Sequence, residues 1–305
     1  MIYTVTLNPA RDRSVVIPDF AAGKVNRITE IRNDPGGKGI NVSKIIKELG
    51  GASIAMGVLG GGTGAYIKES LDKMGIASMF TFVEAETRTN TKISDPVNRV
   101  TTDINEPGAA LDSQTSRKVL DTLLEQLLPG DIVVVAGKLD TKAVDIAGWI
   151  ASIQLKGARV FLDTEGAALS AGVAAQPYLI KPNDAELRML TGETLTTESD
   201  LVAAGRRLVA HGIEIALISL GSDGALCITK DAVLRSKGVK VEAVSTVGAG
   251  DTMMGAFAYG LKDGIRAAFA LSVAASAAAV TCPGTKCPEL SVVKELLTRT
   301  VVYEI

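Results

Sequence analysis

The chain has 305 residues, 47% of them hydrophobic, and a net charge of -2, so it can bury a large core and has no basic surface suited to nucleic acid. Three cysteines and a single histidine exclude a disulfide framework, a histidine-based triad and most zinc sites. A reduced, cytoplasmic setting is therefore expected.

Apolar strands alternate with helical segments along most of the chain. Strands are predicted at residues 1–7, 54–59, 132–136, 160–162, 179–180 and 215–220. Helices are predicted at residues 65–74, 141–153, from 183 onward, 201–210, 251 to about 281, and 292–297. This alternation is typical of a parallel sheet that is covered on both faces.

Neither the first residues nor the longest uncharged run indicates a membrane protein. Residues 1–7 have no basic leader or cleavage site. The longest uncharged run, between Arg266 and Lys286, is rich in Ala and Ser and ends at Pro283-Gly284, which favours a buried helix over a membrane span. We expect a soluble protein with no membrane partner.

Two segments, at about residues 13–33 and 88–105, break the alternation. Polar and apolar residues alternate in them without a helix between, as in half-exposed antiparallel strands. Both segments carry basic residues, so we interpret them as a small sheet that projects over the main one as a lid. The alternative is a pair of edge hairpins with no role in binding.

The most informative motif is Ser245-Thr246-Val247-Gly248-Ala249-Gly250-Asp251-Thr252, which leads directly into a helical pattern. Two glycines let backbone N–H groups converge at the helix start, which forms a cradle for an anion. A carboxylate beside a phosphate suits a base that takes a proton from an attacking hydroxyl. The alternative is a glycine-rich turn in which Asp251 is an ordinary acid at a helix start.

Other glycine motifs are less informative. The G-x-x-x-x-G-K-[ST] motif of a classical P-loop does not occur. Gly60 to Gly64 lack the G-x-G-x-x-G spacing of a dinucleotide loop, and no acidic partner stands out, so a Rossmann dehydrogenase is not expected.

Five motifs together resemble the PfkB (ribokinase-like) family of sugar kinases, over essentially the whole chain. They are Thr6-Leu7-Asn8-Pro9-Ala10-x-Asp12, Gly36-Gly37-Lys38-Gly39-Ile40-Asn41, Arg88-Thr89-Asn90-x-Lys92, Lys181-Pro182-Asn183 and Ser245 to Asp251. They look most like the branch of 1-phosphofructokinases and tagatose-6-phosphate kinases. The resemblance implies one ribokinase-like α/β domain over residues 1–305, a three-layer sandwich with a mainly parallel central sheet and the projecting lid.

The resemblance also implies phosphoryl transfer from MgATP to the 6-hydroxyl of fructose 1-phosphate. Asp251 would be the general base, and the turn of Gly248, Ala249 and Gly250 would hold the charge of the moving phosphoryl group. Lys38 would contact either that group or the phosphate of the acceptor.

Acceptor-binding residues follow from the same resemblance. Asp12 and Asn41 would bond sugar hydroxyls, while Gly36 and Gly37 would let the backbone approach the sugar. A phosphorylated acceptor needs several cationic or polar donors, which would come from Lys24, Arg27, Arg88, Asn90, Lys92 and Lys138.

The residues implied for nucleotide binding are Lys181, Asn183, Ser219, Gly221, Ser222, Gly224, Thr246, Val247, Gly248 and Gly250. Asn183 and Glu186 would order Mg²⁺ through water. Their spacing also fits a helix capping box, and the two readings are compatible.

Two departures from the family pattern bear on the acceptor. Lys138 stands where the family often has a serine, and Glu165 interrupts a common Asp-Thr-Ser-Gly. A kinase for tagatose 6-phosphate or fructose 6-phosphate therefore remains an alternative, as does a regulator that binds nucleotide or sugar phosphate without catalysis. A homodimer joined through the lid is a further expectation from the family.

Overall fold

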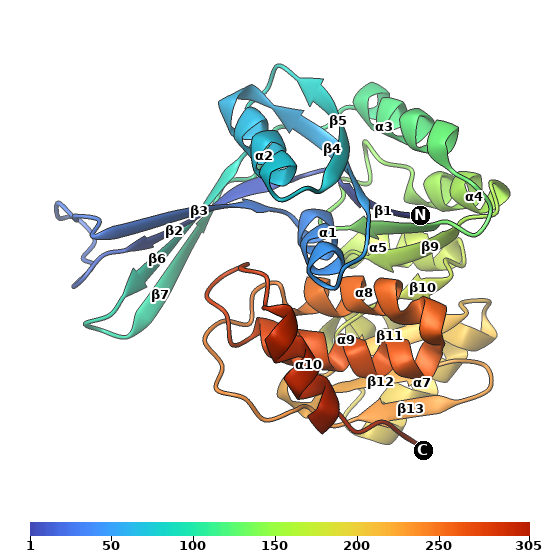
Figure 1. Cartoon of the computed structure of the whole chain (residues 1–305). Helices are drawn as coiled ribbons and strands as arrows, with labels where there is room; N and C mark the ends of the chain where they lie inside the picture. The colour runs from blue at the N-terminus through green and yellow to red at the C-terminus, as the bar shows by residue number, and fades with distance from the viewer.

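A ten-stranded sheet runs through the body of the protein in the computed structural model, which describes residues 1–305 (Figure 1). Its strand order is β14-β13-β12-β11-β10-β9-β8-β1-β4-β5. In chain order these strands are β1 (Ile2–Thr6), β4 (Ile54–Gly60), β5 (Ala77–Val83), β8 (Ile132–Ala136), β9 (Arg159–Asp163), β10 (Leu179–Ile180), β11 (Ile215–Ser219), β12 (Ala225–Ile228), β13 (Val233–Ser236) and β14 (Tyr303–Glu304). From β5 to β11 all pairs are parallel, and β11 to β14 are antiparallel.

Helices cover both faces of this sheet. They are α1 (Lys38–Glu48), α2 (Gly61–Lys73), α3 (Ser113–Gln126), α4 (Ile146–Leu155), α5 (Gly166–Ala174), α6 (Asp184–Thr191), α7 (Glu198–Ala210), α8 (Ala249–Gly260), α9 (Ile265–Ala279) and α10 (Leu290–Arg299). Strand β8 shows how the layers form: Val133 and Val135 belong to one core, while Val134 and Ala136 belong to the core on the opposite face. Because alternate side chains point to opposite faces, a strand that is apolar throughout needs a core on each side. The predicted three-layer α/β arrangement is confirmed.

Two predicted helices have different bounds. The predicted helix from 251 to 281 is two helices, α8 and α9, because Gly264 at φ +95° ends the intervening turn in a backbone conformation that favours glycine. The helix predicted from 141 begins only at Ile146, where the Asp145 side chain accepts a hydrogen bond from Gly148 N–H.

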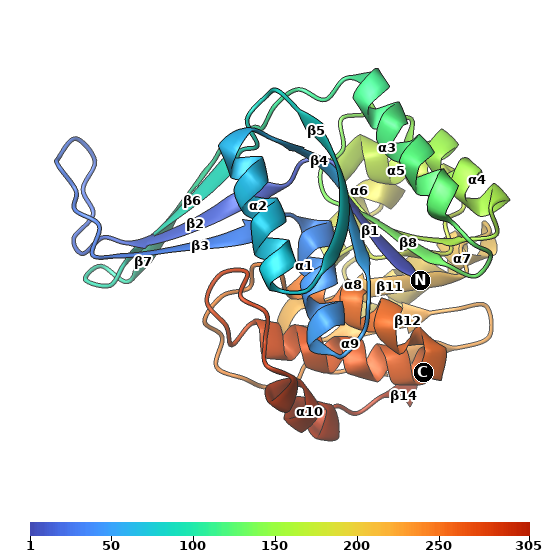
Figure 2. The same ribbon diagram turned by 45° about the horizontal axis from the view of Figure 1, so that its top comes forward.

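The two lid segments form a separate four-stranded sheet, in the order β3-β2-β6-β7. Its strands are β2 (Ala10–Val16), β3 (Glu30–Gly36), β6 (Thr89–Asp95) and β7 (Val100–Asn105). We call it the projecting sheet, since it extends away from the body in both views (Figure 1, Figure 2). The antiparallel pairing that the pattern predicted holds within each segment, for β2 with β3 and β6 with β7, whereas β2 and β6 both run outward from the body and pair in parallel.

No helix combines the length and the apolar character that crossing a bilayer requires. The elements without a sequence prediction include β5, α3 and the antiparallel strands β12 to β14. The strands among these elements are short or only partly apolar, so the alternation of apolar and polar residues that indicates a strand is weak in them.

Candidate functional site

The turn from Gly248 to Asp251 begins helix α8 at the edge of the body. Gly248 is its N-cap at φ +79°, and no side chain caps the helix. The N–H groups of Gly250 and Asp251 have no acceptor within the chain. A Cβ placed on Gly250 would lie 3.1 Å from Lys181 Nζ. Open amides, a helix N-terminus and an ammonium group thus converge, which is the arrangement that an anion requires.

Asp251 is buried at this turn, with 7% of its surface exposed. Burial, together with the nearby Asp163 carboxylate, raises the pKa of Asp251 to about 6. Its Oδ2 accepts a hydrogen bond of 2.9 Å from Asn41 Nδ2. A carboxylate with this pKa can accept a proton near neutral pH, as a general base must.

Asn41 was predicted to bond a sugar hydroxyl, but its amide is engaged on both sides. Its Oδ1 accepts from Lys44 Nζ at 3.1 Å, and its Nδ2 donates to Asp251. From one turn into α1, the amide therefore contacts the Asp251 carboxylate directly, and its bond to a sugar hydroxyl stays a prediction.

Asp163, at the carboxyl end of β9, was not predicted as a site residue. It is 1% exposed and contacts Lys38 Nζ at 3.0 Å and Lys181 Nζ at 3.3 Å. Burial alone would raise the pKa of Asp163, but the Lys181 and Lys38 ammonium groups outweigh it and hold the pKa below its usual range. Its position at the end of a parallel strand is the signal that could have identified it.

Lys38, the first residue of α1, contacts the Asp163 carboxylate through Nζ. Burial opposes its charge, yet Asp163 and Asp251 together raise the pKa of Lys38, so the ammonium stays protonated. Both contacts predicted for Lys38, with the transferred phosphoryl group and with the phosphate of an acceptor, stay predictions.

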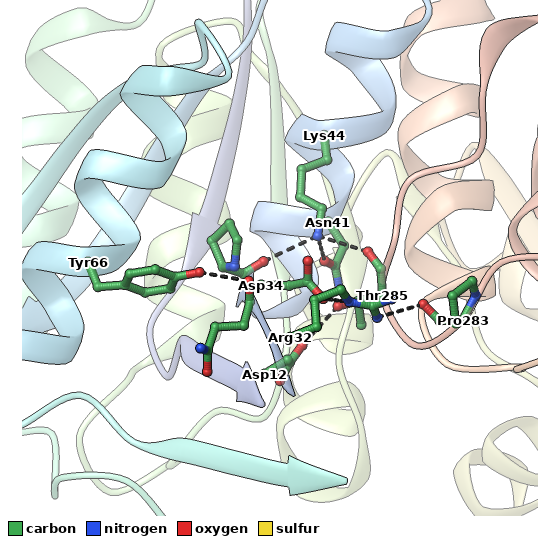
Figure 3. Close-up of polar contacts among 10 residues, drawn as sticks. Asp12, Arg32, Asp34, Asn41, Lys44, Tyr66, Pro283 and Thr285 are labelled. Carbon is green, nitrogen blue, oxygen red and sulfur yellow. Dashed lines mark hydrogen bonds and ion pairs between the residues drawn. The ribbon is translucent and has the colours of Figure 1, made fainter. Parts of the chain in front are cut away.

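A cavity of about 300 Å³ lies between the projecting sheet and the body. Asp12, Asn90 and Thr285 are among its lining residues. Asp12 accepts hydrogen bonds from Asn90 Nδ2 and Thr285 Oγ1, both at 3.1 Å (Figure 3 shows Asp12 and Thr285). Burial raises the pKa of Asp12, which these bonds and nearby Lys44 partly offset.

The glycines beside Asp12 allow close packing. A Cβ on Gly36 would overlap the Asp12 carboxylate, and Gly37 has φ +117°. Both positions therefore need glycine for the local structure, whatever they contact in a complex.

Arg88 and Lys92 line the cavity, but each already has partners. Arg88 donates to the carbonyls of Glu106 and Asn8, at 3.1 and 3.3 Å. Lys92 pairs with Asp103 at 2.9 Å. With Arg13 of β2, three cationic residues therefore line this space.

Three other predicted donors do not line the cavity. Lys24 and Arg27 are exposed in the loop of residues 17–29, at the far end of the projecting sheet (Figure 2). The pairing of Val16 with Glu30 leaves this loop outside the strands, which carries both residues away from the body. Lys138 is exposed in the turn after β8.

The predicted nucleotide residues gather beyond the ends of β10 and β11. Asn183 bridges to Ser219, whose N–H donates to Pro182 O at 3.1 Å. Gly221 and Ser222 are exposed in a single helical turn, and Thr246 and Val247 are exposed before Gly248. Gly224 is buried at φ +91°, and a Cβ there would overlap the carbonyl of Ser236, so packing alone requires this glycine.

The capping box at Asn183 and Glu186 is confirmed. Asn183 Oδ1 accepts from Glu186 N at 2.8 Å, and Glu186 Oε2 accepts from Asn183 N at 2.9 Å. No group of three or more His, Cys, Asp or Glu side chains is placed to hold a metal ion. The second reading of this pair, as a magnesium site, stays a prediction.

Comparisons with known proteins show which family the chain belongs to. The chain is 39% identical to the 1-phosphofructokinase of Xanthomonas campestris pv. campestris, covering 85% of this chain and 84% of that protein. Phosphofructokinase-2 from Escherichia coli, in a crystal structure with potassium, superposes with a TM-score of 0.93 at 30% identity, over 98% of both chains. Ribokinase from Thermotoga maritima shares the fold, with a TM-score of 0.77 at 22% identity over 98% of this chain and 99% of that one. Residues 5–290 match the model of the pfkB family carbohydrate kinases, and the chain belongs to that family.

Proposed function

We propose that this kinase transfers the γ-phosphoryl group of ATP to the 6-hydroxyl of fructose 1-phosphate and so acts as a 1-phosphofructokinase. The observation that carries the proposal is buried Asp251, with a pKa of about 6, beside the open N–H groups of Gly250 and Asp251. The names of the similar proteins support the acceptor. Cationic Arg88 and Lys92 at the cavity suit a phosphorylated sugar.

The residues have distinct tasks in this reaction. Asp251 accepts the proton of the 6-hydroxyl while that oxygen forms a bond to the γ-phosphorus and the bond between phosphorus and ADP breaks. The N–H groups of Gly250 and Asp251, with Lys181 and Lys38, stabilise the charge on the phosphoryl oxygens. Asp163 holds both lysines in place.

Mg²⁺ fits this site as an ion held mainly by water and by the phosphates of ATP. Glu186 keeps Oε1 free of hydrogen bonds within the chain, because only Oε2 serves the capping box. Asp163 Oδ2 is buried without a hydrogen bond, although Lys181 lies near it. Glu186 and Asn183 would hold the ion through water, and the ion would neutralise charge on the phosphates.

An acceptor panel tests the proposal. We expect ADP release with fructose 1-phosphate to have a kcat/KM above that with fructose 6-phosphate, tagatose 6-phosphate or ribose. A preference for either 6-phosphate would reassign the acceptor within the same reaction. Turnover with ribose alone would contradict the proposal that Arg88 and Lys92 bind the phosphate of the acceptor. No turnover with any of the four would leave a binding protein as the better description.

We further propose that the protein works in the cytoplasm as a homodimer joined through the projecting sheet, which would then serve as a lid. Strand β7 is exposed along its whole length, and Val100 and Ile104 on it are 53% and 54% exposed. An unpaired edge with apolar side chains suits a second copy of the same sheet. Ile104→Asp should therefore shift the mass measured by light scattering from dimer to monomer, and a monomeric wild type would contradict the proposal.

A further inference from the structure

Lys44 is a buried lysine that the proposed reaction does not use. It lies in α1, one turn after Asn41, and is 7% exposed. Its ammonium donates to three oxygens: Pro35 O at 3.2 Å, Asn41 Oδ1 at 3.1 Å and Thr285 O at 2.9 Å (Figure 3). A lysine has three N–H donors, so all of them are used.

These acceptors come from three separate parts of the chain. Pro35 lies in β3 of the projecting sheet, Asn41 in α1, and Thr285 in the segment between α9 and α10. Arg32 of β3 also reaches that segment and donates to Pro283 O at 2.9 Å (Figure 3). Lys44 therefore lies where the projecting sheet, the helix behind the base and the segment before α10 meet.

The contact with Asn41 decides which way its amide faces. An ammonium group can only donate, so the amide oxygen must face Lys44 and the NH₂ group must face Asp251. The reversed amide would place NH₂ against an ammonium and oxygen against a carboxylate. Lys44 thus selects the orientation in which Asn41 donates to the base.

The contact with Thr285 reaches the acceptor cavity. While the Thr285 carbonyl accepts from Lys44, its hydroxyl donates to Asp12 at 3.1 Å. Both Thr285 and Asp12 line the cavity. The Lys44 ammonium therefore bonds directly to Asn41, which contacts Asp251, and to Thr285, which contacts Asp12.

We propose that Lys44 is a positioning residue for phosphoryl transfer, which orients Asn41 toward Asp251 and Thr285 toward Asp12 without touching a substrate. The inference rests on the proposed function, since it assigns Asp251 the role of base. Burial lowers the pKa of Lys44, while the nearby Asp34, Asp12, Cys287 and Asp251 oppose this effect.

The test is the pH dependence of kcat in Lys44→Met. Losing the donor that orients Asn41 weakens the hydrogen bond to Asp251, so the acid limb of kcat should move to higher pH. Lys38, Lys181 and Asp163, the other charged groups that act on Asp251, are unchanged in this variant. We expect kcat at neutral pH to fall by about 10- to 100-fold, with the KM for ATP unchanged.

Two further variants show whether Lys44 acts through Asn41. In an Asn41→Ala background, adding Lys44→Met should shift the acid limb by less than it does in the wild-type background, because the amide it orients is gone and only the direct effect of the ammonium charge on Asp251 remains. Lys47→Met, in the last turn of the same helix, is the matched control and should leave the profile unchanged. Lys44→Leu, which likewise removes the donors, carries the same test if Lys44→Met does not fold.

The outcomes separate the two proposals. A wild-type enzyme that phosphorylates none of the sugars overturns the proposed function. A wild-type enzyme that is active, with an acid limb that stays in place in both Lys44 variants, overturns only the role of Lys44. An equal loss of kcat at every pH would mean that Lys44 merely stabilises the fold.

Discussion

The body and the projecting sheet hold their site residues in different ways. On the body, Asp251, Asp163 and Lys181 are each at most 7% exposed and lie at strand ends or helix starts between two large cores. The projecting sheet has a core of only three buried residues, Val15, Ile93 and, just after β2, Ile17. Lys92 and Asp103 on it are 24% and 50% exposed. A thin sheet with little buried area opens more readily than a covered one.

This difference divides the reaction into two parts. Groups that handle the moving phosphoryl charge need fixed positions, because electrostatic stabilisation depends on dipoles and charges that are already oriented. Groups that recognise the acceptor can lie on an element that adjusts to it. We therefore expect substitutions on the body to change kcat or stability, and substitutions on the projecting sheet to change the KM for the sugar phosphate.

The largest effect is expected for Asp251→Asn. This change removes the base but keeps the shape of the side chain, so kcat should fall by about 100-fold or more, while the KM for ATP stays near that of the wild type. The assay is ADP release under saturating substrates. Asp263→Asn, in the exposed turn after the same helix, is the control. An unchanged kcat would mean that the base is another group.

Asp163→Asn should mainly reduce stability. It leaves buried Lys181 without its anion, at a cost of about 3 kcal/mol in the free energy of unfolding. Because the folded pKa of Asp163 is lowered, this stabilisation is present above the ordinary aspartate pKa and is lost as the pH falls through the folded value. Urea unfolding at pH 7 measures the difference.

The control for Asp163 is the exposed ion pair of Lys68 and Asp72, at 2.6 Å. Asp72→Asn should cost less than about 1 kcal/mol, since water screens exposed pairs. Equal losses in the two variants would contradict the contrast drawn between buried and exposed charge.

A smaller effect is expected in the pH dependence of kcat for the wild-type enzyme. A base with a pKa of about 6 works only when deprotonated, so kcat should rise with pH to a plateau above 6. At pH 5 it should be about tenfold below the plateau. Saturating substrate is required, because kcat reports the bound complex rather than the titration of the free sugar phosphate. A limb centred near 4 would show that the pKa of this carboxyl is not raised in the complex with substrates.

The smallest effect is expected for Lys92→Met. Losing one cation at the cavity should raise the KM for the sugar phosphate by about tenfold, with kcat unchanged. Asp103→Asn, which releases Lys92 from its ion pair, should leave this KM unchanged or lower it. If neither variant changes the KM, Lys92 is an ordinary surface charge and the acceptor phosphate binds elsewhere.

Local patterns in the sequence were sufficient for much of the site. The apolar strands and the helices between them predicted a parallel sheet covered on both faces. The glycines around Ala249 predicted the open helix start, and the spacing of Asn183 and Glu186 predicted their capping box. Each of these depends on residues within one turn or one strand, whose geometry neighbouring residues decide.

Contacts between distant segments could not be predicted in this way. Asp163 meets Lys38 across 125 residues, and Lys44 meets Thr285 across 241. The same limit applies to Lys24 and Arg27, whose charge suited the acceptor but whose loop the strand register places at the far end of the sheet, away from the cavity of the same chain.

The sequence by itself thus determined the layers of the fold and the chemistry available at each strand end, since periodicity and glycine conformation act locally. The tertiary structure alone decided which charges are buried together, and so the pKa of the carboxylate that the sequence had already indicated as the base. Burial and the approach of Asp163 raise the pKa of Asp251, and both depend on how the sheet brings strand ends and helix starts into contact.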